Sequence, residues 1–330
     1  MRDHSKEINL VVDSLVAEPG QRLEEHLYVG TMADGTPIRL PIVLINGSQN
    51  QPGKTLYIQS ISDGDELNGI AVIHALLREI QPDSLSGKII AVPIVNFHAF
   101  HARQAFSPID NMKMNRCFPG KKLGTSSERI AHRLFSAAIS QSHYCIDLHQ
   151  GGIHPMIDEV RVRVGSRHQK YKACLELARV FGIGYILDQK GPEGQLAQAA
   201  PHQGIPTINP ELGGCMGWDE GSIAKGIHGV RNVLRYYGFT DGNPELPERQ
   251  IVVNKLISVL SDEGGFIGYK VKLYDEVERH QPVAEVRDVF GNVRDEICAP
   301  ETGIFWSHPA YPMAVTGGVI GKIGVPIDYV

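Results

Sequence analysis

The sequence predicts an α/β protein with a mixed, mostly parallel sheet and helices on both faces, followed by a small all-β domain. From about residue 54, short β-branched runs alternate with helical periods, beginning with TLYIQSIS and ELNGIAVIHALLREI. In the second run, Ile70, Ile73 and Leu77 fall on one helical face. After a turn-rich linker the chain changes to short alternating runs separated by Gly, Pro and Asn, which is typical of β modules. We therefore expect a catalytic domain over residues 1–243 and a barrel-like or sandwich-like β domain over residues 244–330.

The individual elements are expected in a βα order. GTMADGTPIRLPIVLING suggests a hairpin before the βα region, and the letters TSSE at Thr125 spell a capping box at the start of a helix. A later helix is expected from about Ser166 to Phe181, and a further one ends at Gly238. The strands expected between these helices are KIIAVPIVNF, YCIDLH, YILD and PTINPEL.

Composition excludes several classes of protein. The 330 residues are 42% hydrophobic and 21% charged, so the chain can bury a normal core. The net charge of −5, without a basic run, disfavours nucleic acid as a partner. The start of the chain has no apolar signal region and no stretch has the length of a membrane span, so we expect a cytoplasmic protein without membrane contact. Its five cysteines form no CxxC pair and are expected to be reduced.

Two strand ends carry side chains of the kind that binds metal ions. Asp63-Gly64-Asp65-Glu66 follows TLYIQSIS, and His149 ends YCIDLH. Functional groups in α/β sheets gather at the carboxyl ends of the strands. Asp63 and Glu66 can therefore direct their oxygens to one point, and His149 completes a three-ligand site with an open position for water. The alternative is a polar loop whose acidic side chains favour the start of a helix.

Four segments of the sequence together match the motifs of one protein family: DGDELNG, NMKMNRCFPG, IDLHQGG and PELGG. The chain resembles the succinylglutamate desuccinylase/aspartoacylase family, relatives of the zinc carboxypeptidases, from about residue 25 to the C-terminus. That family carries H-G-D/N-E-x-N-G, N-x-N-R-x-F-P-G, D-L-H and E-L-G-G at these places. The resemblance implies a carboxypeptidase-like fold and a C-terminal extension that shapes the mouth of the active site.

The resemblance also implies the catalytic machinery. One divalent ion, zinc first with manganese or cobalt as alternatives, is expected on Asp63, Glu66 and His149. Glu211 is expected to act as general base and then to pass the proton to the leaving amine. The alternative for Glu211 is a strand-end carboxylate without a catalytic role.

Three further residues receive roles from the resemblance, and a fourth, Asp147, receives one from its spacing along the strand. Arg103 is expected to face the scissile carbonyl, and Asn115 with Arg116 is expected to hold a substrate carboxylate, which a guanidinium can bind through two hydrogen bonds. Asp147, two residues before His149, is expected to orient a metal ligand by a contact on the side away from the ion. The alternatives are solvated surface charges for the arginines and a strand cap for Asp147.

One residue departs from the family pattern, because Asp63 stands where the family has its first histidine ligand. Two carboxylates and a neutral imidazole cancel a divalent charge, whereas two histidines and one glutamate leave +1. We expect a weaker Lewis acid and a shift toward manganese or another oxygen-tolerant metal. The alternative is that the site has lost its metal.

The function expected from these residues is metal-dependent deacylation of a small N-acyl amino acid. N-succinylglutamate, N-acetylaspartate and N-acetyl-diaminobutyrate are substrates of the kind the family takes. Two alternatives stay open, a carboxypeptidase-like hydrolase of short peptides and a non-catalytic binding protein with a degenerate metal site. The partner is then a small molecule, and the sequence leaves a homo-oligomer open.

Overall fold

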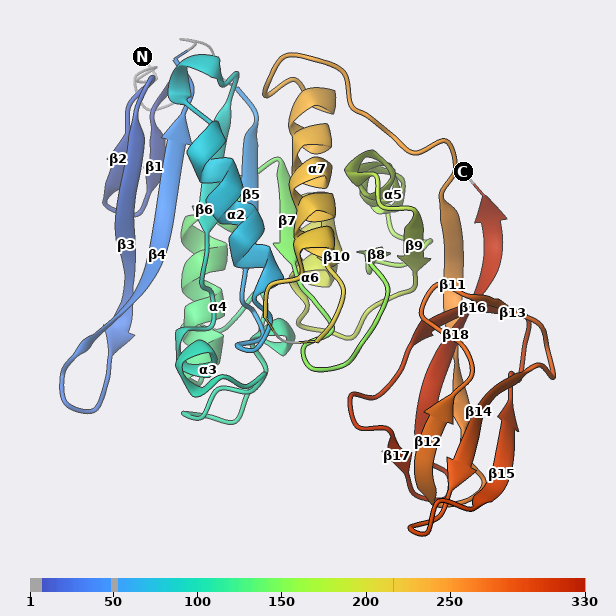
Figure 1. Ribbon diagram of the computed structural model, residues 1–330. Helices are drawn as coiled ribbons and strands as arrows, with labels where there is room; N and C mark the ends of the chain where they lie inside the picture. The colour runs from blue at the N-terminus through green and yellow to red at the C-terminus, as the bar shows by residue number, and fades with distance from the viewer. Residues whose placement is uncertain (1–7, 49–52, 216, 330) are drawn as a thin grey trace.

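The computed structural model describes residues 8–48, 53–215 and 217–329 (Figure 1). Its strands are β1 Leu10–Val12, β2 Leu15–Ala17, β3 Arg22–Thr31, β4 Pro37–Asn46, β5 Thr55–Ser60, β6 Lys88–Val92, β7 Tyr144–Leu148, β8 Glu159–Val162, β9 Tyr185–Asp188, β10 Thr207–Glu211, β11 Ile251–Leu260, β12 Gly265–Tyr269, β13 Glu276–Val277, β14 Pro282–Arg287, β15 Val293–Cys298, β16 Gly303–Ser307, β17 Met313–Ala314 and β18 Val319–Tyr329. Its α-helices are α2 Asn68–Glu79, α3 Phe97–Ala102, α4 Ser126–Ala137, α5 Tyr171–Phe181, α6 Leu196–His202 and α7 Glu220–Tyr236. Short 3₁₀ helices lie at Pro82–Ser84, Met114–Arg116 and Ile139–Gln141.

One long mixed sheet organises the molecule, in the order β13-β16-β18-β11-β9-β8-β10-β7-β5-β6-β4-β3. From β11 to β6 every neighbouring pair is parallel except β8 with β10. The outer pairs are antiparallel, including the β3–β4 hairpin that the sequence predicts. The expected fold class, with a mostly parallel centre, is confirmed.

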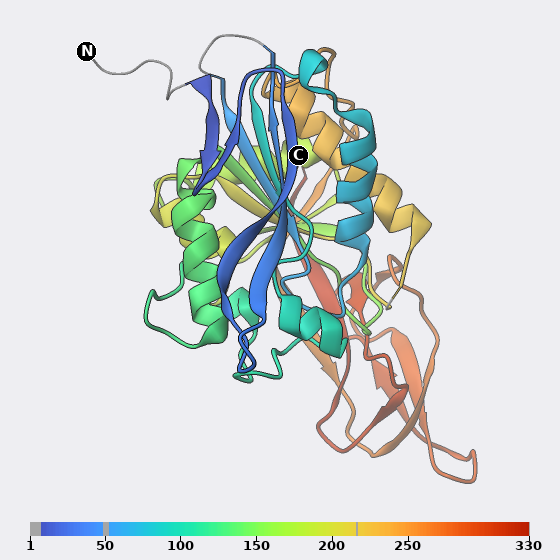
Figure 2. The ribbon, with the colours of Figure 1, turned by 90° about the vertical axis from the view of Figure 1, so that its left-hand side faces the viewer.

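Helices cover both faces of this sheet, as Figure 2 shows with the sheet between them. On one face, Ile73 of α2, Leu177 of α5 and Val233 of α7 belong to one buried apolar cluster. On the other face, Leu134 of α4 and Ala199 of α6 belong to a second cluster. Burial of these two apolar stripes against the sheet provides the main stabilising free energy of this part of the chain.

Local sequence signals explain where the helices begin and end. Thr125 and Glu128 form the reciprocal capping box at the start of α4, as predicted. The prediction that a helix begins near Ser166 is wrong, because α5 begins at Tyr171. The preceding residues form turns, in which the backbone N–H of Lys170 donates to the ring of His168 at 3.1 Å. Beyond the end of α7, Gly238 has a φ of 74°, which a residue without Cβ adopts without strain.

The C-terminal region is all β, as expected, and it has its own apolar cluster around Val286 and Phe305. A four-stranded sheet, β15-β14-β12-β17, forms its outer part. The long strands β11 and β18 run from the main sheet into this region, so the main sheet continues across the expected boundary (Figure 1). The division at residues 243 and 244 stays a prediction.

Two further observations concern the chain as a whole. In the parts that the structure describes, each helix is too short or too polar to cross a lipid bilayer. The thiols of all five cysteines are free, as the sequence predicts.

Candidate metal centre and catalytic groups

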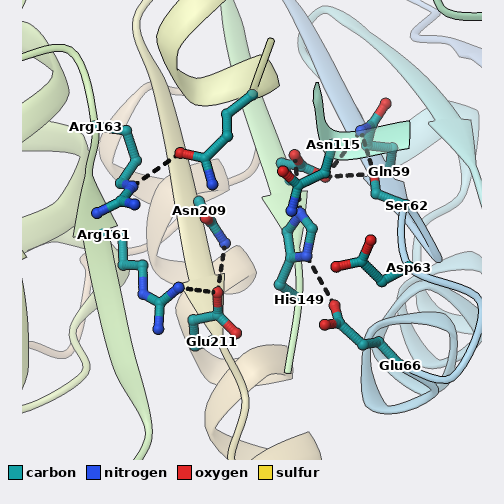
Figure 3. Close-up of polar contacts among 12 residues, drawn as sticks. Gln59, Ser62, Asp63, Glu66, Asn115, His149, Arg161, Arg163, Asn209 and Glu211 are labelled. Carbon is teal, nitrogen blue, oxygen red and sulfur yellow. Dashed lines mark hydrogen bonds and ion pairs between the residues drawn. The ribbon is translucent and has the colours of Figure 1, made fainter. Parts of the chain in front are cut away.

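Three buried side chains from two strand ends meet in one place. Asp63 and Glu66 lie in the loop between β5 and α2, and His149 directly follows β7. One ligand atom from each lies within 4.8 Å of the other two, and the residues are 1%, 8% and 3% exposed. The structure therefore brings the expected ligand set together at the carboxyl edge of the sheet (Figure 3).

Hydrogen bonds fix the orientation of the His149 ring. Its Nε2 lies 3.1 Å from Oδ2 of Asp147, and its Nδ1 lies 2.7 Å from Oε2 of Glu66. The other oxygen of Asp147 accepts hydrogen bonds from Gln59 at 2.8 Å and Ser62 at 3.3 Å. A carboxylate behind a histidine holds the ring and selects its tautomer, so Nδ1 is the atom left to face a metal.

The acidic and basic groups of this cluster perturb each other. Burial raises the pKa of Glu66 to about 8, and the charge of Asp63 adds to the increase. Burial alone would lower the pKa of His149, but the carboxylates of Asp147 and Glu66 outweigh it and raise that pKa well above its ordinary value. The buried pair thus retains protons that a divalent cation has to displace.

The donor set fits a divalent metal ion. Oδ1 of Asp63 is buried and has no hydrogen-bond partner among the described residues, which is costly for a carboxylate unless a cation binds there. Two carboxylates and one imidazole suit zinc, manganese and similar ions. Oδ2 of Asp63 lies 2.8 Å from the ammonium of Lys113, which comes from the segment between α3 and α4.

Close backbone packing places the ligand loop. A Cβ at Gly64 would lie 2.1 Å from the carbonyl carbon of Ala99. Only glycine therefore lets the ligand loop pack this closely against the backbone of α3. At the start of α2, the backbone N–H of Asn68 donates to Gln150 at 2.8 Å, and its side chain donates to the carbonyl of Leu212 at 2.9 Å. These bonds connect the ends of β5, β7 and β10.

The expected general base lies beside the metal cluster. Glu211 ends β10, and its backbone pairs with that of His149 across a parallel bridge. Its side chain is 6% exposed, and Oε1 lies 2.7 Å from Nη1 of Arg161 and 3.4 Å from the amide of Asn209. In Figure 3, Glu211 and Arg161 lie on one side of His149, and Asp63 and Glu66 lie on the other.

Arg161 is a site residue that the sequence reasoning missed, together with its strand β8. Glu159, also on β8, accepts a hydrogen bond from Arg161 Nε at 2.6 Å and another from the indole of Trp306 at 2.8 Å. Glu159 is fully buried, and Trp306 belongs to β16 of the C-terminal region. The alternation of EVRVRV at residues 159–164 is the signal that predicts such a strand.

The expected substrate-binding residues lie around this cluster in different environments. Asn115 is buried and accepts a hydrogen bond from the exposed Arg116 next to it. Arg103 is exposed at the end of α3 and has no side-chain partner among the described residues. Its neighbour Gln104 accepts a backbone hydrogen bond from Gly64 at 3.1 Å, so Arg103 lies next to the ligand loop.

A pocket of about 320 Å³ is lined in part by Arg161, the partner of Glu211. Arg161 of β8 and His154 of the loop before it line one side, while Trp306, His308 and Lys322 line the other from the C-terminal region. Among the lining residues that the structure describes, none is acidic. The pocket therefore offers an apolar wall and side chains that can carry positive charge.

Fold and site together define an α/β protein with an Asp/Glu/His cluster beside a buried glutamate at the carboxyl edge of its sheet. A family model for the succinylglutamate desuccinylase/aspartoacylase catalytic domain matches residues 52–237. The chain belongs to this family, as its sequence motifs predict. Membership indicates a hydrolase that acts on amide bonds.

Individual relatives agree with this assignment. Over 259 residues the chain is 28% identical to the N-alpha-acetyl-L-2,4-diaminobutyric acid deacetylase of Halomonas elongata, covering 76% of this chain and 75% of that protein. The product-bound structure of the ectoine utilization protein EutE (DoeB) from Ruegeria pomeroyi matches with a TM-score of 0.85, at 23% identity, over 97% of this chain and 99% of that one. A succinylglutamate desuccinylase/aspartoacylase from Rhodobacter sphaeroides matches with a TM-score of 0.84, at 22% identity, over 96% and 99% of the two chains. These two structures share the fold with this chain.

Proposed function

We propose that this protein is a metal-dependent amidohydrolase that removes the acyl group from a small N-acyl amino acid. The observation that carries the proposal is the meeting of Asp63, Glu66 and His149 beside the buried Glu211. Family membership supports the amide-hydrolase class, and the deacetylase of Halomonas elongata supports an acylated amino acid as substrate. Zinc is the first expectation for the metal, with manganese or cobalt as alternatives.

The proposed chemistry divides between the ion and the protein. A bound divalent ion supplies Lewis acidity to the acyl carbonyl and lowers the pKa of a water molecule. Glu211 takes the proton of the attacking water at its carboxylate and passes it to the leaving nitrogen. Asp147 keeps Nδ1 of His149 directed at the ion, since it holds Nε2 at 3.1 Å.

Arg161 has a positioning role in this proposal. Its guanidinium lies 2.7 Å from Oε1 of Glu211 and is held on its other side by Glu159. Such a clamp fixes the orientation of the carboxylate that moves the proton. The second oxygen of Glu211 has no hydrogen bond to Arg161 and is the atom that we assign to proton transfer.

The substrate in this proposal carries negative charge. Asn115 with Arg116 binds its carboxylate, and Arg103, which lies next to the ligand loop, donates to the acyl oxygen. The pocket beside Arg161, with His308 and Lys322 at its wall, favours an anionic group over a cationic one. Substrates with two carboxylates are therefore expected to be hydrolysed faster than substrates with a cationic side chain.

Hydrolysis of a panel of N-acyl amino acids tests the proposal. The metal-stripped protein, reloaded with zinc, manganese or cobalt, is given acetyl and succinyl derivatives of acidic, neutral and basic amino acids, and short peptides. We expect the reloaded protein to hydrolyse the amide bond, and we expect a metal chelator to abolish this activity. Glu211→Gln should lower the rate by about 10³-fold. Glu248→Gln, at an exposed glutamate, is the matched control and should retain full activity.

Other outcomes decide between the alternatives. Cleavage of peptides in preference to acyl amino acids would assign the chain to the peptidases. Binding of acyl amino acids without turnover under any metal would make it a binding protein. A cytoplasmic location, consistent with the five free thiols, belongs to the same proposal.

A further inference from the structure

We propose that Lys113 is a positioning residue that adapts the metal site to Asp63. Its ammonium holds one oxygen of Asp63 and offsets one of the two carboxylate charges around the ion. The inference rests on the proposed metal-dependent function, and it explains how an aspartate serves in a site of this kind.

The two oxygens of Asp63 have different surroundings. Oδ2 forms an ion pair with Lys113 Nζ at 2.8 Å, whereas Oδ1 is buried without a hydrogen-bond partner among the described residues. The Asp63 side chain is 2% exposed, so solvent does not satisfy Oδ1. Lys113 thus occupies the outer oxygen and leaves the inner one for the metal, which favours binding through a single oxygen.

The backbone around Lys113 is anchored, although the lysine side chain is 27% exposed. The next residue, Met114, is fully buried in the apolar cluster that α4 covers. The carbonyl of Lys113 accepts hydrogen bonds from the N–H of Arg116 at 2.9 Å and from the thiol of Cys117 at 3.3 Å. The position from which the ammonium reaches Asp63 is therefore set by the fold.

Counting charges shows what the ammonium changes. A divalent ion with Asp63, Glu66 and a neutral His149 has a net charge of zero. With Lys113 included, the net charge is +1, which is the value that two neutral histidines and one glutamate give. Lys113 therefore restores the positive field that polarises an acyl carbonyl, and it does so by withdrawing electron density from one ligand.

Metal affinity in a double-mutant cycle tests this role without relying on turnover. The stripped chain and the variants Lys113→Met, Asp63→His and the double variant are titrated with zinc against a chromophoric chelator. Because the ammonium competes with the ion for Asp63 and also repels the ion, we expect Lys113→Met to tighten zinc binding about tenfold. In the Asp63→His background the ion pair is absent and only the longer-range charges remain, so removal of the lysine should change affinity by about threefold or less.

Two controls make the cycle specific. Lys113→Arg keeps the charge and should keep the native affinity within about threefold. Lys122→Met removes an exposed lysine from the same segment and should change nothing. In the native background, kcat at saturating zinc should fall about tenfold for Lys113→Met while KM stays unchanged, so tighter binding accompanies slower turnover.

The outcomes separate this inference from the proposed function. An equal effect of Lys113→Met in both backgrounds, or none with Asp63 present, would overturn the role of Lys113. Coupled affinities without hydrolysis of any amide would support Lys113 and overturn the deacylase. Failure of zinc, manganese and cobalt to bind any of the variants would overturn both.

Discussion

The two sides of the candidate site hold their acidic side chains in different ways. On the metal side, Lys113 is the one partner of the Asp63 side chain among the described residues, and that lysine is partly exposed. On the base side, Arg161 binds both Glu211 and Glu159, and Glu159 is also fixed by Trp306 from the C-terminal strands. The Asp63–Lys113 pair thus reaches solvent at the lysine, whereas the base side is a buried network that spans both parts of the fold. Substitutions on the two sides should therefore change different quantities.

The largest effect is expected on the metal side. His149→Ala removes the only imidazole of the described ligand cluster and leaves Glu66 and Asp63 facing each other. We expect no stoichiometric zinc in the purified variant and no hydrolysis, as measured by metal analysis and the acyl amino acid assay. Tight, stoichiometric zinc in this variant would place the metal elsewhere.

The base side should respond in turnover and not in metal binding. Arg161→Lys keeps a cation but cannot bridge two glutamates, so Glu211 loses its fixed orientation. We expect kcat to fall by about 10²-fold, with zinc affinity unchanged within experimental error. A loss of zinc affinity as large as the loss of kcat would show that the two sides are not independent.

A smaller effect on the metal side is expected from substitution of Asp147. Asp147→Asn keeps the shape but weakens the bond that holds His149 Nε2. Loss of such a supporting carboxylate should weaken zinc affinity by about 10 to 100-fold. The titration used for Lys113 measures it. Unchanged affinity would favour the alternative in which Asp147 only caps its strand.

Trp306 tests whether the C-terminal strands support the base side. Trp306→Phe removes the indole hydrogen bond to the buried Glu159. We expect the free energy of unfolding to fall by about 1 to 3 kcal/mol, because a buried carboxylate loses a donor. Zinc affinity should be unchanged. Chemical denaturation measures the first quantity, and unaltered stability would mean that the network does not need the indole.

The pH dependence of the metal-free protein should report on the metal side through Glu66 and His149. Because the pKa of Glu66 is raised from 4.5 to about 8, the folded chain retains a proton that the unfolded chain releases. The free energy of unfolding should therefore fall as the pH rises through that window, and the raised pKa of His149 acts in the same direction above 6.5. Glu66→Gln should reduce this decline, and zinc should remove it. A free energy of unfolding that rises across the window, or the same decline in Glu66→Gln, would contradict this assignment.

The sequence predicts the metal side better than the base side, for physical reasons. Asp63, Glu66 and His149 follow strands with strong periodic patterns, so their common edge follows from the topology of parallel strands. Strand β8 is short, and its register places Arg161 beside Asn209 on a neighbour distant in sequence. The ion pair of Lys113 with Asp63 depends on an irregular segment whose path no local pattern encodes. Continuation of the main sheet through β11 and β18 likewise depends on long-range pairing.

The most direct measurement is anomalous diffraction at the zinc edge from crystals of the zinc-loaded protein. We expect one strong peak per chain, within bonding distance of carboxylate oxygens of Asp63 and Glu66 and of Nδ1 of His149, with Lys113 still in contact with Asp63. Zinc bound at another place, or absent while these three side chains keep their positions, would contradict this expectation.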